Sequence, residues 1–220
     1  MDTSKKEDPS VDNLRIEYER PELQRSTLKA DPVEQFKAWL DDAIATDIIE
    51  PHAMTLATAT ASGIPSARVV LLRGYDAKGF VFYTNYDSQK GKELAENPYA
   101  ALTFYWASLH RQVRISGTVS RISAIESNHY FQSRPKSSQI GAWSSKQSQV
   151  LNSREELEDE FKEFEAEFQE KDVPRPPYWG GFIVSPEIIE FWQGRPSRLH
   201  DRFRYKLQGD GSWMIERLSP

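Results

Sequence analysis

Runs rich in apolar, β-branched and aromatic residues recur through the central and C-terminal parts of the chain, as in β-strands. Turn-forming residues such as Ser62-Gly63 and Asn97-Pro98 separate these runs by short gaps. Most gaps are too short for the crossover that parallel neighbours require. The sequence therefore predicts a meandering, mostly antiparallel sheet that closes into a barrel. Its strands are expected at residues 53–60, 66–73, 79–85, 99–106, 111–122, 180–194, 202–208 and 212–218.

A helix is expected to begin at Asp31-Pro32, where an N-cap residue precedes a proline at the first helical position. Apolar residues then recur at helical spacing until about Asp47. The face of this helix that turns toward the core is expected to consist of Val33, Phe36, Leu40 and Ile44.

Two capping boxes mark the starts of helices in the second half of the chain. Residues 123–126 (SAIE) open a helix that runs toward Arg134-Pro135, and residues 153–156 (SREE) open a longer one. Acidic side chains crowd most faces of the longer helix, which is typical of a solvated surface. Its buried face is expected to consist of Leu157, Phe161, Phe164 and Phe168.

Residues 1–30 are polar, charged and without periodicity, so they are predicted to form a mobile N-terminal arm. No Gly/Ser-rich or Pro-rich linker divides the middle of the chain. The interpretation is one domain over residues 31–220.

The amino-acid composition excludes several classes of function. The formal net charge of -5 argues against a general nucleic-acid binder, and the absence of cysteine excludes thiolate catalysis and disulfides. The four histidines share no ligand spacing, so no metal is expected. The chain starts without an apolar signal segment and has no apolar stretch long enough to span a membrane. A cytoplasmic protein without a membrane partner is therefore expected.

One stretch concentrates cationic side chains in this acidic chain: residues 192–202 read WQGRPSRLHDR. On an extended segment, residues two apart point to the same side, so Arg198, His200 and Arg202 would converge. Adjacent cations are costly unless an anion relieves them. Further cations stand among hydroxyls and amides that can also donate to phosphate oxygens, namely Arg68, Arg73, Lys90 and Arg134. Each of these alone is more often a solvated surface charge, but their clustering favours a phosphate site.

Five longer motifs carry a resemblance: RVVLLRGYDAKGFVFYTNYDSQKGKELAENP, RQVRISG, YFQSRPKSSQIGAWSSKQS, WGGF and EFWQGRPSRLHDRF. In this order and spacing, from about residue 14 to Pro220, the chain resembles the pyridoxamine 5′-phosphate oxidase family. The resemblance implies an α+β fold that is mainly β, a split antiparallel β-barrel with peripheral helices. It also implies a homodimer with two FMN molecules at the subunit interface.

The resemblance implies a set of FMN contacts. Arg68 and Lys90 match residues that hold the FMN phosphate, and Gln89 stands beside Lys90 where an arginine is common in the family. This departure removes one charge from the expected phosphate site. The remaining matches are Tyr83, Thr84, Gln112, Gln147, Ser148, Trp192 and Arg202.

The resemblance also implies a substrate site. Arg198 and His200 match catalytic positions against the substrate ring, while Arg15 and Tyr18 match an N-terminal segment that can cover the site as a lid. The substrate phosphate would be held by Arg73, Tyr130, Arg134 and Ser138, with Arg73 in a position where lysine is usual. A planar guanidinium keeps the charge of lysine but donates with a different geometry.

The implied reaction oxidises pyridoxamine 5′-phosphate or pyridoxine 5′-phosphate to pyridoxal 5′-phosphate, with dioxygen reduced to hydrogen peroxide through the flavin. The preference between amine and alcohol stays open, as do the separate proton-transfer roles of Arg198 and His200.

Three other interpretations fit the same residues. A carrier or sensor barrel would bind flavin or a B6 phosphate without turnover, and another flavin-dependent oxidoreductase would differ in substrate only. A single-stranded nucleic-acid binder would stack bases on aromatics among arginines, but the acidic balance disfavours it. In a purely structural interpretation, Tyr130 is a core aromatic and Trp192 a packed indole.

Overall fold

A computed structural model describes residue 18 and residues 22–220 of the chain. Arg15 and most of the expected arm lie outside the described residues. The elements follow one another as α1 (Pro32–Ile44), β1 (Ala53–Ala59), β2 (Pro65–Leu71), β3 (Gly74–Asp76), β4 (Gly79–Asn85), α2 (Gln89–Glu96), β5 (Tyr99–Trp106), β6 (Arg111–Arg121), α3 (Ala124–Ser133), α4 (Lys136–Ser144), α5 (Arg154–Glu167), β7 (Trp179–Gln193), β8 (Asp201–Leu207) and β9 (Trp213–Leu218). Short 3-10 turns lie at Arg25–Thr27, Ala107–Leu109 and Pro196–Arg198.

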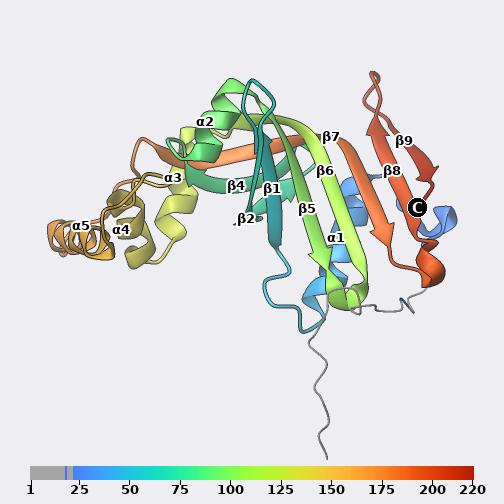
Figure 1. Ribbon diagram of the computed structural model, residues 1–220, viewed down its shortest axis with the longest axis horizontal. Helices are drawn as coiled ribbons and strands as arrows, with labels where there is room; N and C mark the ends of the chain where they lie inside the picture. Colours follow the sequence, from blue (N-terminus) through green and yellow to red (C-terminus); the bar gives the residue numbers. More distant parts are fainter. Residues whose placement is uncertain (1–17, 19–21) are drawn as a thin grey trace, which may run out of the picture.

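The strands form one sheet in the order β2-β1-β5-β6-β7-β4-β3, and in addition β8 pairs with β7 and β9 pairs with β8. Every ladder between the described strands is antiparallel, as predicted. The sheet curves into a half-barrel with helices at its periphery (Figure 1). Among the described residues no ladder joins β2 to β3, so the barrel is split, as the resemblance implies, and the prediction of a closed barrel is wrong.

Strand β7 organises the whole sheet because it pairs with three neighbours. Its first part pairs with β4 from Trp179 to Val184, and its last part pairs with β8 from Ile188 to Gln193. Strand β6 follows it along both parts, with a register shift at Ser116/Gly117. A bulge of this kind bends a strand. The two ends of β7 therefore lie in two different regions of the molecule, one beside β4 and the other beside β8.

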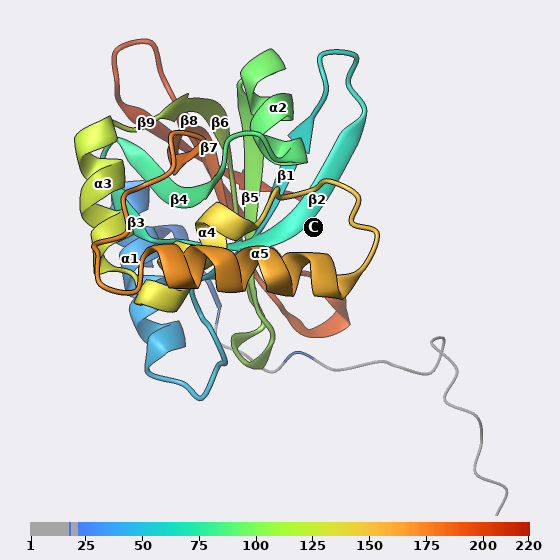
Figure 2. The same ribbon diagram turned by 90° about the vertical axis from the view of Figure 1, so that its left-hand side faces the viewer.

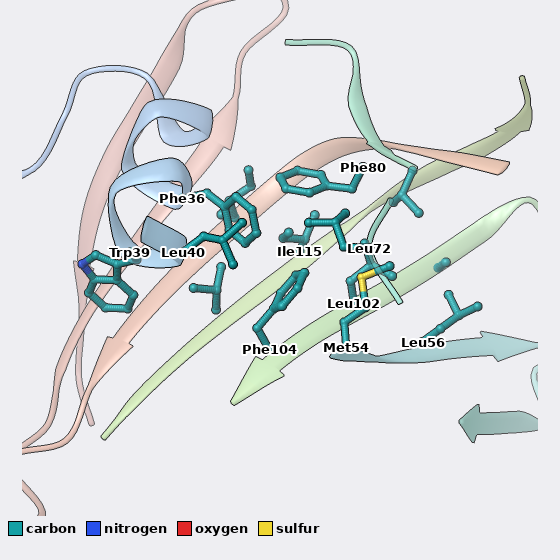
Figure 3. Close-up of a cluster of buried hydrophobic side chains, with 14 of the residues drawn as sticks. Phe36, Trp39, Leu40, Met54, Leu56, Leu72, Phe80, Leu102, Phe104 and Ile115 are labelled. Atoms are coloured by element: carbon teal, nitrogen blue, oxygen red, sulfur yellow. The ribbon is translucent and has the colours of Figure 1, made fainter. Parts of the chain in front are cut away.

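The main core lies between α1 and the inner face of the sheet (Figure 3). The ring of Phe36 packs 5.0 Å from the rings of both Phe80 and Phe104, and all three side chains are fully buried. Burial of one such side chain stabilises the fold by about 1.5–3 kcal/mol. The core therefore anchors α1 to strands β4 and β5.

The predicted helix at Asp31-Pro32 is confirmed, and the Asp31 carboxylate accepts hydrogen bonds from two backbone amides of its first turn. The expected burial of Ile44 is wrong, because 61% of that residue is exposed. Successive helical residues are about 100° apart, so Ile44 turns away from the face that Ala43 and Trp39 bury.

A second apolar cluster joins α3, α4 and α5 to the start of β7, around Phe131, Ile140 and Trp179. Helix α5 lies across α4 at one end of the molecule (Figure 2). The predicted burial of Leu157, Phe161 and Phe164 is wrong in degree, because these side chains are only half-buried, while Phe168 beyond the helix end is buried. A surface helix that packs on one side leaves the flanks of its apolar stripe partly open.

The observed strands agree with the predicted ones to within about two residues, but β3, α2 and α4 were not predicted. No helix in the described part of the chain is both long and apolar enough to span a membrane. The assignment of residues 31–220 to one domain stays a prediction.

Candidate functional site

A pocket of 340 Å³ opens between β2, β4, the start of α2 and the end of α3. We call it the cationic pocket, because four cations line its wall: Arg68 of β2, Arg73 between β2 and β3, Lys90 of α2, and Arg134 directly after α3. Its lining includes these sequence-predicted site residues: Arg68, Arg73, Tyr83, Thr84, Lys90, Tyr130, Arg134 and Gln147. Trp179 of β7 also lines it and was not predicted as a contact.

Lys90 enters the cationic pocket from the first turn of α2, which the Ser88 hydroxyl caps. Its ammonium nitrogen donates to Gln147 Oε1 at 2.9 Å and to Thr84 Oγ1 at 3.3 Å. Burial lowers the pKa of Lys90 to about 8, with a further lowering from Arg68 and an opposing effect from Glu93. Among the described residues no carboxylate lies within ion-pair distance of this ammonium. An anion in the pocket would relieve the cost of burying it.

Arg68 reaches the pocket from β2, and neighbouring side chains of β1, β2 and α2 hold its guanidinium in place. Its Nη2 donates to Ser66 Oγ at 2.6 Å and lies 3.4 Å from Glu93 Oε2, while its Nη1 donates to the Thr58 hydroxyl. Only about a fifth of the Arg68 side chain is exposed. The fork is therefore fixed before any ligand arrives, which limits the entropy lost on binding.

Arg134 stands at the end of α3 with its guanidinium 4.6 Å above the ring of Trp179. Burial is the main cause that lowers its pKa, and Arg73 lowers it further. The Nη1 atom is buried and has no hydrogen-bond partner within the part of the chain that the structure describes. An unpaired buried donor beside three other cations fits a phosphate group of a ligand.

Aromatic rings form one wall of the same pocket. Tyr83 stacks on Tyr130 with ring centroids 3.8 Å apart, and Trp179 extends the stack 5.4 Å from Tyr83. Tyr130 thus packs against other rings, as its structural interpretation expected, and at the same time lines the cationic pocket. A flat apolar wall beside phosphate donors suits a planar phosphorylated ligand.

Other predicted residues gather at the far end of β7. Trp192 pairs with Gln112 of β6 on one side and with Arg202 of β8 on the other. The ring of Tyr18 stands edge-on 5.9 Å from Trp192 and 5.4 Å from His200. We call Tyr18, Trp192, His200 and the neighbouring His110 the C-terminal cluster.

His200 is held in one orientation within this cluster by a hydrogen bond. Its Nδ1 accepts a hydrogen bond from the backbone amide of Arg195 at 3.1 Å. The proton of the neutral ring therefore resides on Nε2. Burial, and secondarily Arg198, lower the pKa of His200, which favours this neutral form.

The expected extended conformation is wrong at Arg198, the first of the three residues Arg198, His200 and Arg202. The segment is not extended, because Pro196–Arg198 forms a 3-10 turn in which Ser197 and Arg198 have φ values of 55° and 61°. Arg202 is already paired, since its Nε and Nη2 donate to the Glu190 carboxylate at 2.9 and 3.1 Å. Left-handed residues other than glycine are costly and often mark functional turns.

The cationic pocket and the C-terminal cluster lie at opposite ends of β7. Thr84 pairs with Gly180, whereas Gln112 and Arg202 pair with Trp192. At about 3.3 Å per residue the intervening strand is about 40 Å long. None of the four residues of the C-terminal cluster lines the cationic pocket of the same chain.

The remaining predicted residues lie beside these two regions. Ser148 follows Gln147 with a φ of 71°, and Ser138 is half-buried in the first turn of α4 without lining the pocket. Gln89 is exposed on α2 and donates to Glu93 Oε1 at 2.9 Å. The buried carboxylate of Glu93 was missed, although it follows Gln89 and Lys90 at helical spacing.

The fold is that of a split-barrel protein, and its cationic pocket carries donors that suit phosphate. Residues 40–168 match the family model described as pyridoxamine 5′-phosphate oxidase, and residues 179–220 match the pyridoxine 5′-phosphate oxidase C-terminal dimerisation region. The chain belongs to the pyridoxamine 5′-phosphate oxidase family, whose members are oxidoreductases.

Relatives match the sequence of this chain over nearly its full length. The pyridoxine/pyridoxamine 5′-phosphate oxidase of Bordetella petrii is 56% identical over 96% of this chain and 100% of its own. The protein of the same name from Cyanothece sp. is 53% identical over 96% of this chain and 99% of its own. The crystal structure of PhzG from Burkholderia lata, in complex with tetrahydrophenazine-1-carboxylic acid, has a TM-score of 0.84 at 33% identity, covering 89% of this chain and 95% of its own. A pyridoxamine 5′-phosphate oxidase-related, FMN-binding protein of Nostoc punctiforme, 17% identical, shares the fold with a TM-score of 0.69 over 88% of this chain and 100% of its own.

Proposed function

We propose that the protein is an FMN-dependent oxidase that converts pyridoxamine 5′-phosphate and pyridoxine 5′-phosphate to pyridoxal 5′-phosphate, with dioxygen reduced to hydrogen peroxide. One observation carries the proposal: the cationic pocket holds a buried ammonium and a buried guanidinium nitrogen that both lack an anionic partner among the described residues. We assign the Lys90 ammonium to the FMN subsite and the Arg134 guanidinium to the substrate subsite, as two phosphorylated ligands require. The relatives named for this reaction support the assignment.

The residues of the pocket fit the phosphate of FMN. Arg68, Lys90 and Thr84 would hold it, because each places a hydrogen-bond donor on the pocket wall near Gln147. When bound, FMN supplies the acceptor for the hydride equivalent and the route to dioxygen. The protein contributes position and charge.

The substrate phosphate would bind beside Tyr130, between Arg73 and Arg134. Ser138, four residues beyond Arg134 at the start of α4, does not line the pocket and stays a predicted contact of this phosphate. Anchoring the phosphate far from the reacting carbon orients that carbon without any covalent bond to the protein. The planar ring of the substrate would then face the aromatic wall.

The second half of the site would come from another copy of the chain. Within one chain the C-terminal cluster is about 40 Å of strand away from the cationic pocket. The segment that carries the cluster matches a dimerisation region. We therefore propose a homodimer in which each C-terminal cluster faces the cationic pocket of the other subunit.

His200 and Arg198 would act at the reacting carbon. Neutral His200 presents an N–H at Nε2 that can orient or move a proton of the substrate amine or hydroxyl. Arg198 is exposed on a strained turn beside it, placed to meet a group outside its own chain. Tyr18 packs on His200 and would close the site as part of the N-terminal arm. We also propose that the protein is located in the cytoplasm.

The purified protein is expected to be yellow with bound FMN and to consume oxygen when pyridoxamine 5′-phosphate is added. Absorption spectra, an oxygen electrode and sedimentation check these expectations together. A colourless protein that FMN cannot reconstitute would exclude the proposal, and a flavin-loaded monomer would exclude the shared site. Flavin binding without oxygen uptake would support a carrier or sensor instead.

A second candidate is another flavin-dependent oxidoreductase on the same barrel. The likeness to PhzG favours it, since the compound in that structure is named as a carboxylic acid and not as a phosphate. Pyridoxamine without its phosphate distinguishes the two candidates. Equal turnover of the phosphorylated and unphosphorylated amines would favour the second candidate, because Arg73 and Arg134 would then have no role in recognition.

FMN affinity is expected to be constant between about pH 7 and about pH 8, where the phosphate is a dianion, and to fall by up to about tenfold per pH unit above about pH 8. The pKa of Lys90 is lowered in the ligand-free pocket, and a bound phosphate raises it, so binding above this pH must take up a proton. Fluorescence titration with FMN measures the profile. Riboflavin, which has no phosphate, should give a flat profile, and so should FMN with the Lys90→Met variant.

A further inference from the structure

Glu93 is a buried carboxylate behind the cationic pocket, only 6% exposed. Its Oε2 accepts from the hydroxyls of Thr58 and Ser66 and lies 3.4 Å from Arg68 Nη2. Its Oε1 accepts from Gln89 at 2.9 Å. Both oxygens are therefore engaged, and this side chain connects α2 to the β1–β2 ladder.

The local geometry explains why the partners of Glu93 converge. Thr58 and Ser66 are register partners in the β1–β2 ladder, so their hydroxyls lie side by side. Ser66 and Arg68 are two residues apart on one strand and share a face. Glu93 follows Lys90 by three residues on α2, which places both side chains near that face.

A carboxylate close to a phosphate site repels the ligand, so its presence needs a compensating role. Burial raises the pKa of Glu93, but hydrogen bonds from Ser66, Thr58 and Gln89, together with Arg68, outweigh it and lower the pKa to about 2. The carboxylate is thus ionised whenever the protein is folded near neutral pH. Without it, Arg68 and Lys90 would be two cations in one pocket with nothing to offset them.

We infer that Glu93 is a positioning residue of the proposed FMN site, which holds the Arg68 guanidinium against the pocket wall and offsets the charge of the Arg68–Lys90 pair. The inference rests on the proposed function. Gln89 belongs to the same arrangement, since its amide faces Glu93 and does not line the pocket. Its role is to orient the carboxylate.

Two variants separate the geometric role from the electrostatic one. Glu93→Gln keeps the shape and an acceptor for Arg68 but removes the charge, whereas Glu93→Asp keeps the charge but shortens the reach to Arg68. Glu96→Gln is the matched control, because Glu96 carries the same charge on the same helix but is exposed.

The charged groups that act on the Lys90 ammonium are Arg68 from β2 and Glu93 from α2. Thr84 of β4 and Gln147 contact it as neutral groups, while Arg73 and Arg134 line the same pocket as cations. Removal of the Glu93 charge leaves only cations around Lys90, which therefore loses its proton at lower pH.

The experiment titrates flavin-stripped full-length protein with FMN and with riboflavin across the pKa of Lys90, by quenching of flavin fluorescence. For Glu93→Gln, the pH at which FMN affinity begins to fall should move down by on the order of one unit. For Glu93→Asp, that pH should stay in place while FMN affinity drops by about tenfold at every pH, because Arg68 loses its support. Riboflavin affinity and the Glu96→Gln control should match the wild type.

An FMN profile of Glu93→Gln identical to the wild type would overturn the charge role, and unchanged FMN affinity in Glu93→Asp would overturn the role in holding Arg68. Equal losses for FMN and riboflavin would show that Glu93 only maintains the fold, which also overturns the inference. If the wild type binds neither flavin, the proposed function itself is wrong.

Discussion

Replacement of His200 by leucine is expected to lower turnover of pyridoxamine 5′-phosphate by about 100-fold or more, with FMN still bound. Leucine keeps the apolar contacts with Trp192 and Tyr18 but removes the N–H at Nε2. Arg198→Leu is expected to lower turnover by about tenfold or more, because it removes the charge beside His200. Steady-state kinetics and flavin absorption of both variants give the measurement.

The matched control for the histidine variant is His52→Leu, since His52 is half-buried at the start of β1, outside both the cationic pocket and the C-terminal cluster. It should leave turnover unchanged. Loss of FMN from the His200 variant would reassign this residue to the cofactor. Unchanged turnover in both the His200 and the Arg198 variants would contradict their roles.

The strands could be predicted from sequence because alternation is a local signal. The run at residues 99–106 has one apolar face that is buried, and the structure places this strand and the strand at residues 79–85 where the sequence indicates. Antiparallel pairing followed from the short gaps alone. The opening between β2 and β3 could not be seen this way, because it depends on sheet curvature and not on any single strand.

Helices α2 and α4 were missed for lack of an apolar stripe. Leu94 is the main buried apolar side chain of α2, whose buried face also carries Lys90 and Glu93. Helix α4 buries Gln139, whose amide bonds to three carbonyl groups at the end of α3. Polar contacts contribute to the packing of both helices, and hydrophobic periodicity gives no signal for such contacts.

The residues of the candidate site also differ in how far the sequence could predict them. Cations such as Arg68 and Lys90 stand out against an acidic composition, and the family motifs supplied their roles. The physical argument for the C-terminal segment assumed an extended chain, and the turn at Pro196–Arg198 made it wrong. Glu93 gave no signal, because a carboxylate in an acidic chain is ordinary until its burial is known.

Replacement of Arg134 by methionine is expected to raise the Michaelis constant for pyridoxamine 5′-phosphate by about 10- to 100-fold. The loss of a charged hydrogen bond to phosphate costs about 1.5–3 kcal/mol, at about 1.4 kcal/mol per tenfold. The same change should leave the melting temperature unaltered or higher, because it removes a half-buried guanidinium whose Nη1 has no partner within the described residues. Methionine retains the packing on Trp179.

Arg175 offers a matched control on the same tryptophan. Its Nη1 donates to the Trp179 carbonyl oxygen and its Nε donates to Asn128 at 2.6 Å, so it is a structural arginine. Arg175→Met should lower the melting temperature and leave the Michaelis constant unchanged, the opposite pattern. Arg73→Met should resemble Arg134→Met in kinetics, whereas Arg73→Lys keeps the charge and should cost much less. A less stable Arg134→Met protein with an unaltered Michaelis constant would make Arg134 structural too, and the unpaired Nη1 would then have no ligand to meet.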